Sequence, residues 1–226
     1  MVQALQKKVQ TLKGGGGGSS AEAILEAAEL LMSRRGYDGV SLREIAKEAG
    51  ASLSSVTYFF RTKENLLAAI YERHTKPMNA RRLELLREAE RISDLDERLP
   101  AIVRAHVLPA FTSQSASGGG AQFTRLRGIM SMTGGEAAQR IIASSFDEIS
   151  RAFIDAVARA LPKADRASIV WRGHFLLGSL YYTLVTPERI DRLTGVAGAG
   201  SDHERAIDEL VDATVASLKA LSPEAV

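Results

Sequence analysis

The amino-acid sequence of 226 residues predicts an all-α fold. Apolar residues recur three and four positions apart in one segment after another, which is the spacing of a helix face. Serine and threonine stand before many of these segments and glycine follows several of them, as helix caps require. No segment alternates apolar and polar residues with the β-branched enrichment of a strand, so we expect helices only.

The composition excludes several classes of protein. Apolar residues make up 45% and charged residues 25% of the chain, the balance of an ordinary globular protein. The absence of cysteine rules out disulfides, thiolate catalysis, cysteine-ligated zinc and iron–sulfur clusters. No apolar run is long enough to span a membrane, and the N-terminus lacks a signal-peptide core. We therefore expect a cytoplasmic protein.

Residues 1–20 are predicted to be an extension that precedes the folded domains. A short helical stripe is followed by the segment 14–20, GGGGGSS, which has the composition of a flexible linker. Two interpretations stay open. The extension is either an expression tag or wrongly assigned start, or a basic arm with Lys7, Lys8 and Lys13 that touches DNA or a partner.

Capping patterns place the first helices. A capping box from Ser19 to Glu22 is predicted to open a helix that ends at Gly36, and a second box opens a short helix at Ser41. Two further helices are predicted to begin after Ser52 and Thr62, and Pro77 is expected to end or kink the second of them. Beyond it, helical segments are predicted at 78–92, 95–112, 121–132, 135–161, 164–186 and 202–221. Small-residue stretches at 113–120 and 195–201 are predicted to be mobile connections.

The segment 41–60, SLREIAKEAGASLSSVTYFF, has the pattern of a helix-turn-helix. Its turn is made of small residues around Gly50, and Ile45 and Val56 stand where the two helices must bury their contact. Short hydroxyl side chains crowd the second helix, so it can enter a major groove and reach base edges or phosphates. The candidate DNA-contacting residues are Ser41, Arg43, Ser52, Leu53, Ser54, Ser55, Thr57, Tyr58 and Lys63. A helical hairpin with surface serines is the alternative.

The charge distribution fits a nucleic-acid-binding head. Residues 1–77 carry 11 basic and 8 acidic side chains, whereas residues 78–226 carry 18 basic and 19 acidic ones.

Residues 24–70 resemble the N-terminal domain of the TetR family of bacterial repressors. The matching features are Arg35-Gly36-Tyr37, Ser41, Ile45-Ala46, Ala49-Gly50, Ser52, the run Val56-Thr57-Tyr58-Phe59-Phe60, and Lys63-Glu64-Asn65-Leu66-Leu67. The resemblance covers about a fifth of the chain and its combined motif is specific.

Three features of the sequence depart from the family pattern. Thr57 stands where the family usually has Tyr, and Phe59 stands where it often has His or Tyr, although both positions commonly touch DNA in the family. Ala21 and Glu22 stand where a basic residue usually begins the first helix. These departures bear on the operator sequence and not on DNA binding itself.

The resemblance implies a regulator with two parts. Residues 21–66 would form a three-helix DNA-binding head, and residues 67–226 a helical body that binds an effector and dimerises. The family default is a repressor that binds a palindromic operator as a homodimer. Effector binding would respace the two heads, so that they no longer fit successive major grooves about 34–36 Å apart.

The body contains two helices suited to dimerisation. Eleven of the seventeen residues in Ile169–Val185 are apolar, which predicts burial on both sides. The segment 202–221 has an apolar face made of Ile207, Leu210, Val211, Val215, Leu218 and Leu221. We expect the segments 164–186 and 202–221 to form a four-helix interface across a two-fold axis, with burial inside one subunit as the alternative.

The same body is predicted to hold a small hydrophobic effector in a mostly apolar pocket. The candidate effector-binding residues are Phe123, Leu126, Met130, Trp171, His174, Phe175 and Tyr182. Trp171, His174 and Tyr182 are amphipathic and need a polar partner when buried. The stretch 171–184 is similar to the C-terminal part of family members related to fatty-acid-responsive regulators.

An enzyme is the main contrasting class. The four histidines have no metal-ligand spacing, and the sequence contains no GxxxxGK[ST], HExxH or GxSxG motif. We expect no catalytic residue, metal or cofactor. A helical adaptor that binds only proteins remains the alternative, and it would lack salt-dependent DNA affinity.

Overall fold

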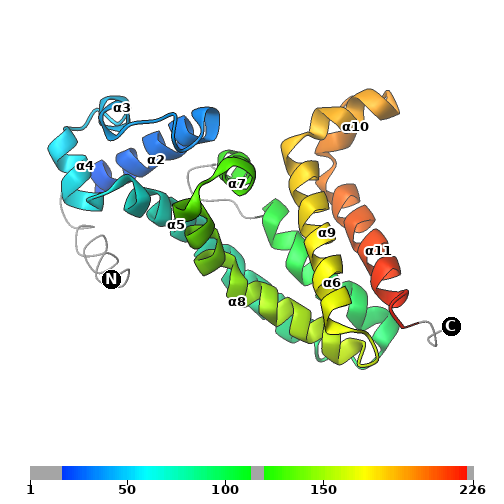
Figure 1. Cartoon of the computed structure of the whole chain (residues 1–226). Helices are drawn as coiled ribbons and strands as arrows, with labels where there is room; N and C mark the ends of the chain where they lie inside the picture. Colours follow the sequence, from blue (N-terminus) through cyan, green and yellow to red (C-terminus); the bar gives the residue numbers. More distant parts are fainter. Residues whose placement is uncertain (1–16, 113–119, 223–226) are drawn as a thin grey trace. The chain divides into compact units, whose positions relative to one another are not determined.

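The computed structural model describes residues 17–112 and 120–222, and every regular element in these ranges is helical (Figure 1). The predicted all-α fold is thus confirmed. The helices are α2 (Gly17–Arg35), α3 (Leu42–Glu48), α4 (Leu53–Phe60), α5 (Lys63–Ala89), α6 (Leu95–Thr112), α7 (Gly120–Thr133), α8 (Glu136–Ala160), α9 (Arg166–Val185), α10 (Pro187–Thr194) and α11 (His203–Lys219), with a 3-10 turn, η1, at Ala199–Ser201. The predicted segments 95–112, 121–132, 135–161, 164–186 and 202–221 agree with α6, α7, α8, α9 and α11 to within two residues at each end.

The described residues form two compact units, which we treat separately. The first unit contains residues 17–73 and 125–142, and the second contains residues 74–112, 120–124 and 143–222. The boundary falls inside α5, between Arg73 and His74. The predicted division into a head of residues 21–66 and a body of residues 67–226 stays a prediction.

The first unit is built around α2, α3 and α4, which pack against one another (Figure 1). Its core consists of apolar side chains that are fully removed from solvent, among them Ile24, Met32, Ile45, Val56 and Leu66. Burial of such side chains contributes roughly 1.5–3 kcal/mol each, enough to hold these short helices in place.

An ion-pair cluster ties α2 to the start of α5 in the same unit. The Arg73 guanidinium donates to the carboxylates of Glu22, at 2.5 Å, and Glu29. Glu29 is only 1% exposed, so its charge is buried against this arginine. A buried carboxylate of this kind fixes the register of the two helices, because either partner left alone would be an uncompensated charge.

Two expectations about helix ends are wrong. Helix α2 begins at Gly17, so Ser19 lies inside it and does not cap it. The carboxylate of Glu22, predicted to complete a capping box, pairs with Arg73. The segment 17–20 is therefore helical rather than linker, while residues 1–16 lie outside the described residues, as does 113–119.

Helix α5 runs through Pro77 and continues to Ala89, so the separate helix predicted at 78–92 does not exist. Proline removes one backbone hydrogen bond, here to the turn that contains Arg73. Pro77 lies on the exposed side of the helix, whereas Thr75 and Met78 beside it are buried. Packing of the buried side outweighs the lost hydrogen bond.

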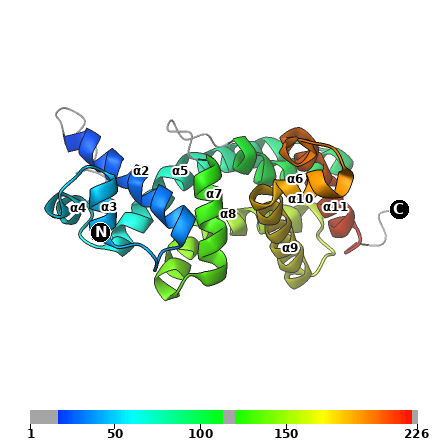
Figure 2. The same cartoon turned by 90° about the horizontal axis from the view of Figure 1, so that it is seen from above.

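The second unit has its core between α6, α9 and α11, together with α8 and the end of α5. Figure 2 shows α6, α9 and α11 close to one another within this unit. The apolar face predicted for 202–221 lies in this core, since Ile207, Leu210, Val211, Val215 and Leu218 are all buried. This face therefore packs inside the chain, and the dimer interface predicted for 164–186 and 202–221 stays a prediction.

Helix α9 is buried on one side only, contrary to expectation. Ile169, Leu176 and Leu180 face the core, while Val170, Trp171, Phe175, Tyr182 and Val185 are exposed. The helix packs against α11 within the chain, and its opposite side remains apolar and open.

Helix α10 was absent from the sequence prediction. It carries Pro187 in its first turn and ends at Gly195, which has a left-handed φ of 71°. Proline at the start and glycine after the end are the usual helix signals, so this helix was detectable from sequence. The following segment is ordered by Asp191, whose carboxylate accepts the N–H groups of Gly198 at 3.1 Å and Gly200 at 2.7 Å.

Candidate nucleic-acid interface

The helix-turn-helix predicted for 41–60 is present as α3 and α4. Gly50 in the turn has a φ of +60°, which side chains rarely tolerate. The Ala51 N–H donates to the Ala46 carbonyl at 2.9 Å and closes the turn. Ile45 and Val56 are completely buried, so the two helices meet where their sequence spacing predicted.

A capping box at Ser41 fixes the start of α3. The Ser41 hydroxyl accepts the Glu44 N–H at 3.2 Å, and the Glu44 carboxylate accepts the Ser41 N–H at 2.8 Å. The same carboxylate also accepts the Ser41 hydroxyl and pairs with Arg35 at 2.8 Å. Hydrogen bonds from Ser41 and the charge of Arg35 lower the pKa of Glu44 to about 2.

Helix α4 exposes the side chains predicted to meet DNA and buries its opposite side. Leu53 and Tyr58 are 38% and 59% exposed, and Ser52, Ser54 and Thr57 are exposed as well. Val56 and Phe60 anchor the helix in the core of the unit. A rigidly held helix with an exposed, hydroxyl-rich side fits insertion into a major groove.

Several of the hydroxyls already have local partners. Ser52 caps α4 by accepting the Ser55 N–H at 3.0 Å, and its oxygen lies 2.8 Å from the hydroxyls of Ser54 and Ser55. Thr57 donates to the Leu53 and Ser54 carbonyls, at 3.1 Å each. The methyl group of Thr57 and the side chains of Leu53 and Tyr58 are thus the parts of α4 best suited to contact bases. Which residues touch DNA stays a prediction.

Basic side chains flank α4. Arg43 on α3 is exposed, and Lys63 at the start of α5 lies over the Tyr37 ring, with 4.2 Å between its nitrogen and the ring centre. Arg61 between α4 and α5 is exposed and has a left-handed φ of 64°. Arg61 was not among the predicted residues, although a basic residue directly after the second helix is a detectable signal for phosphate binding.

The residues predicted to bind an effector do not gather in one place. Trp171, His174, Phe175 and Tyr182 are all exposed on α9, where Trp171 contacts both His174 and Phe175 through their rings. Phe123, Leu126 and Met130 are buried in α7, and Phe123 stacks on His74 with 4.3 Å between the ring centres. The four residues of α9 lie on its exposed side, because its buried side consists of Ile169, Leu176 and Leu180, and their role in effector binding stays a prediction.

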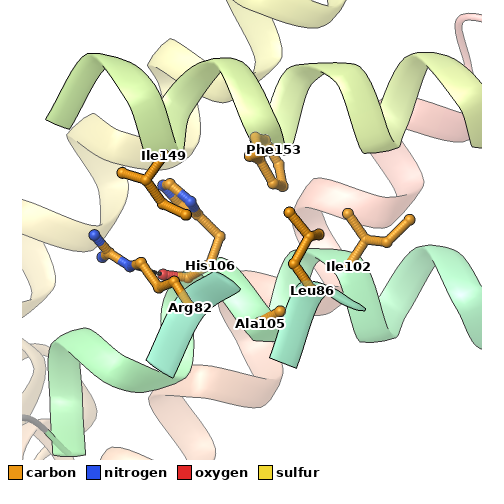
Figure 3. A pocket seen from close by; sticks show the side chains of 7 residues that line it. All are labelled: Arg82, Leu86, Ile102, Ala105, His106, Ile149 and Phe153. Atoms are coloured by element: carbon orange, nitrogen blue, oxygen red, sulfur yellow. Dashed lines mark hydrogen bonds between the residues drawn. The ribbon is translucent and has the colours of Figure 1, made fainter. Parts of the chain in front are cut away.

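A small cavity of the second unit lies elsewhere, between α5, α6 and α8 (Figure 3). Its lining residues are Arg82, Leu86, Ile102, Ala105, His106, Ile149 and Phe153. None of them was predicted from the sequence. Arginine in the middle of a long helix normally indicates a solvated surface, so its burial carries no signal in a single sequence.

The described residues hold no group of three or more His, Asp or Glu side chains that would fit a metal ion. Within the same ranges, every helix is too short or too polar to traverse a lipid bilayer.

The fold and the α3–α4 geometry define a helix-turn-helix DNA-binding protein with a helical body. Two family descriptions match the chain: "Bacterial regulatory proteins, tetR family" over residues 24–70, and "Tetracyclin repressor-like, C-terminal domain" over residues 104–217. The chain belongs to the TetR family of DNA-binding transcriptional regulators, and the resemblance seen in the sequence is confirmed.

Individual relatives match only part of the chain. The chain is 34% identical over 64 residues to the probable HTH-type transcriptional regulator YttP of Bacillus subtilis, which is 26% of this chain and 31% of YttP. It is 36% identical over 69 residues to the HTH-type transcriptional repressor NemR of Escherichia coli K12, which is 30% of this chain and 35% of NemR. The matches thus span about a third of the length of these relatives.

The fold extends over the whole of a solved family member. The TetR-family regulator PfmR of Thermus thermophilus superposes with a TM-score of 0.55 at 17% identity, covering 87% of this chain and 97% of PfmR.

Proposed function

We propose that this regulator is a homodimeric repressor that binds a palindromic DNA site through α4 and releases it when a small molecule binds the second unit. The observation that carries the DNA-binding part is the exposed side of α4, with Leu53, Thr57 and Tyr58 held over a buried Val56. Repression is the role named for the relative NemR, which is 36% identical to this chain over 69 residues.

Dimerisation is supported by the open side of α9. Trp171, Phe175 and Tyr182 are each more than half exposed, and Ile190 and Leu193 add exposed apolar side chains on α10. A monomer rarely exposes so many large apolar side chains close together in sequence, whereas a self-complementary patch around a two-fold axis would cover them.

Effector control is supported by the small pocket between α5, α6 and α8, where Arg82 is buried. It combines apolar walls with a buried charge, the arrangement of a small-molecule site rather than of plain core.

The test is retention of genomic DNA fragments by the purified protein at a low and a high salt concentration. We expect one palindromic site to be retained, with affinity that falls steeply with salt because phosphate contacts release counterions. Tyr58→Ala should weaken this binding, whereas Met132→Ala, which alters an exposed residue outside the helix-turn-helix, should not. If DNA is retained without sequence preference, or is not retained at all, α3 and α4 have only a structural role. That outcome would favour a protein-binding adaptor.

A further inference from the structure

Arg82 of α5 is buried in the second unit with part of its guanidinium unused. It is 1% exposed, its Nε donates to the His106 carbonyl at 2.9 Å, and its Nη1 donates to the Asn79 side chain at 3.3 Å. Its Nη2 is buried and has no hydrogen-bond partner. Burial lowers the pKa of Arg82 to about 10, so the side chain still carries its charge at neutral pH.

The part of the chain that the structure describes supplies no anion for this charge. Among the described residues, the interactions of Arg82 are those with Asn79 and His106, and no carboxylate pairs with it. The partly buried Arg73 differs, because its charge is matched by Glu22 and Glu29. A buried cation without a counter-charge costs free energy unless something else pairs with it, so a retained one points to a ligand.

The carbonyl partner of Arg82 lies in the turn of α6 that precedes Pro109. Arg82 Nε donates to the His106 carbonyl, and this hydrogen bond holds the guanidinium against α6.

The rest of the cavity is apolar. Figure 3 shows Arg82, His106 and Ile149 together at one end, with Leu86, Ile102 and Phe153 at the other. The His106 ring lies 4.7 Å from the Phe153 ring, measured between centres. The open space between these side chains is smaller than a water molecule, so an occupant displaces Phe153 or Leu86 as it enters.

We propose that this cavity is the effector site of the regulator and that it takes a small organic carboxylic acid as its anion. The carboxylate pairs with the Arg82 guanidinium, whose planar fork matches two oxygens, and a compact branched or aromatic body contacts Leu86, Ile102 and Phe153. Inorganic phosphate fits poorly, because apart from Arg82 and the His106 ring the walls are apolar and offer no donors for its remaining oxygens. The effector role rests on the ligand release proposed above, whereas the binding of an acid at Arg82 does not.

The experiment titrates the full chain with benzoate and isovalerate, and with the uncharged amides benzamide and isovaleramide, at millimolar concentrations. Calorimetry and the shift in melting temperature report binding. We expect at least one acid to bind and raise the melting temperature, and its amide to bind at least tenfold more weakly because it lacks the charge. Equal binding of acid and amide, or no binding of any acid, overturns the proposal.

Two variants locate the site. Arg82→Met should abolish binding of the acid without loss of fold, since an apolar side chain of similar length often replaces a buried charge without penalty. Arg82→Lys keeps the charge but loses the planar fork, and we expect at least a tenfold loss of affinity. The matched control is Arg81→Met, which alters the exposed neighbour paired with Glu84 at 2.5 Å and should bind like the wild type. Unchanged affinity in both Arg82 variants overturns the proposal.

DNA release is measured separately in the same titrations. If the acid binds at Arg82 without releasing DNA, the effector control is wrong while the acid site stands. If a different compound releases DNA and no acid binds, the regulator stands and this site is wrong.

Discussion

The Lys63 ammonium lies over the face of the Tyr37 ring, 4.2 Å from its centre. The two residues come from the loop after α2 and the start of α5, and partial burial lowers the pKa of Lys63. The pKa falls from a value far above neutrality, so the ammonium keeps its charge. Its contact with the Tyr37 ring holds it in a defined position. Lys63 is therefore placed to bind a phosphate beside α4.

Replacing Lys63 with Ala should weaken operator binding and reduce the slope of log affinity against log salt by about 1, the value for one lost phosphate contact. Lys219→Ala is the control, because that lysine lies on α11 and pairs with Asp96 at 2.5 Å. A salt slope equal to that of the wild type would mean that Lys63 does not contact a phosphate.

Tyr37→Leu tests whether the ring positions the lysine. An exposed cation–π contact contributes about 0.5–1 kcal/mol, so we expect a few-fold loss of operator affinity with an unchanged salt slope. The measurement is the same DNA titration. If affinity does not change, the ring has only a structural role.

Glu44→Gln should change the stability of the protein in a pH-dependent way. The folded-state pKa of Glu44, about 2, lies below the usual value near 4.5, so its contribution is fully present above pH 4.5 and is lost as the pH falls toward 2. We expect the variant to melt a few degrees below the wild type at pH 7, and the difference to shrink on acidification, as followed by thermal unfolding. The control is Glu48→Gln at the other end of α3, and a difference independent of pH would contradict the prediction.

Gly50→Ala should destabilise the first unit by about 1 kcal/mol, because alanine is strained at a φ of +60° although no atom obstructs its Cβ. Gly135→Ala is the matched control, with equally open space and no positive φ. Chemical denaturation of the two variants measures the difference. Equal stability would show that the turn relaxes at no cost.

Phe175→Glu should convert the proposed dimer into a monomer, because a charge in the middle of the exposed apolar side of α9 would be buried without a partner. Sedimentation equilibrium of the variant and the wild type checks this. Met132→Glu changes an equally exposed apolar residue on α7 and should leave the dimer intact. A dimer that survives Phe175→Glu would place the interface elsewhere.

Local sequence signals predicted the helix-turn-helix because its geometry depends on neighbours along the chain. Ser41 and Glu44 are three residues apart, and Gly50 alone meets the conformational demand of the turn. The same reasoning failed at Pro77, where one lost hydrogen bond is a local cost and the burial of Thr75 and Met78 is a tertiary gain.

Sequence by itself thus determined the all-α fold, the family and the exposed side of α4, since periodicity, caps and a specific motif are local properties. Only the tertiary structure decided which side of α9 faces the core, that the apolar face of α11 packs inside the chain, and that Arg82 is buried. An apolar helix face has the same sequence pattern whether it packs within its own subunit or against another. An arginine on a helix likewise gives the same sequence signal whether it is exposed or buried. Those outcomes depend on which distant segments come together, and periodicity along one helix does not contain that information.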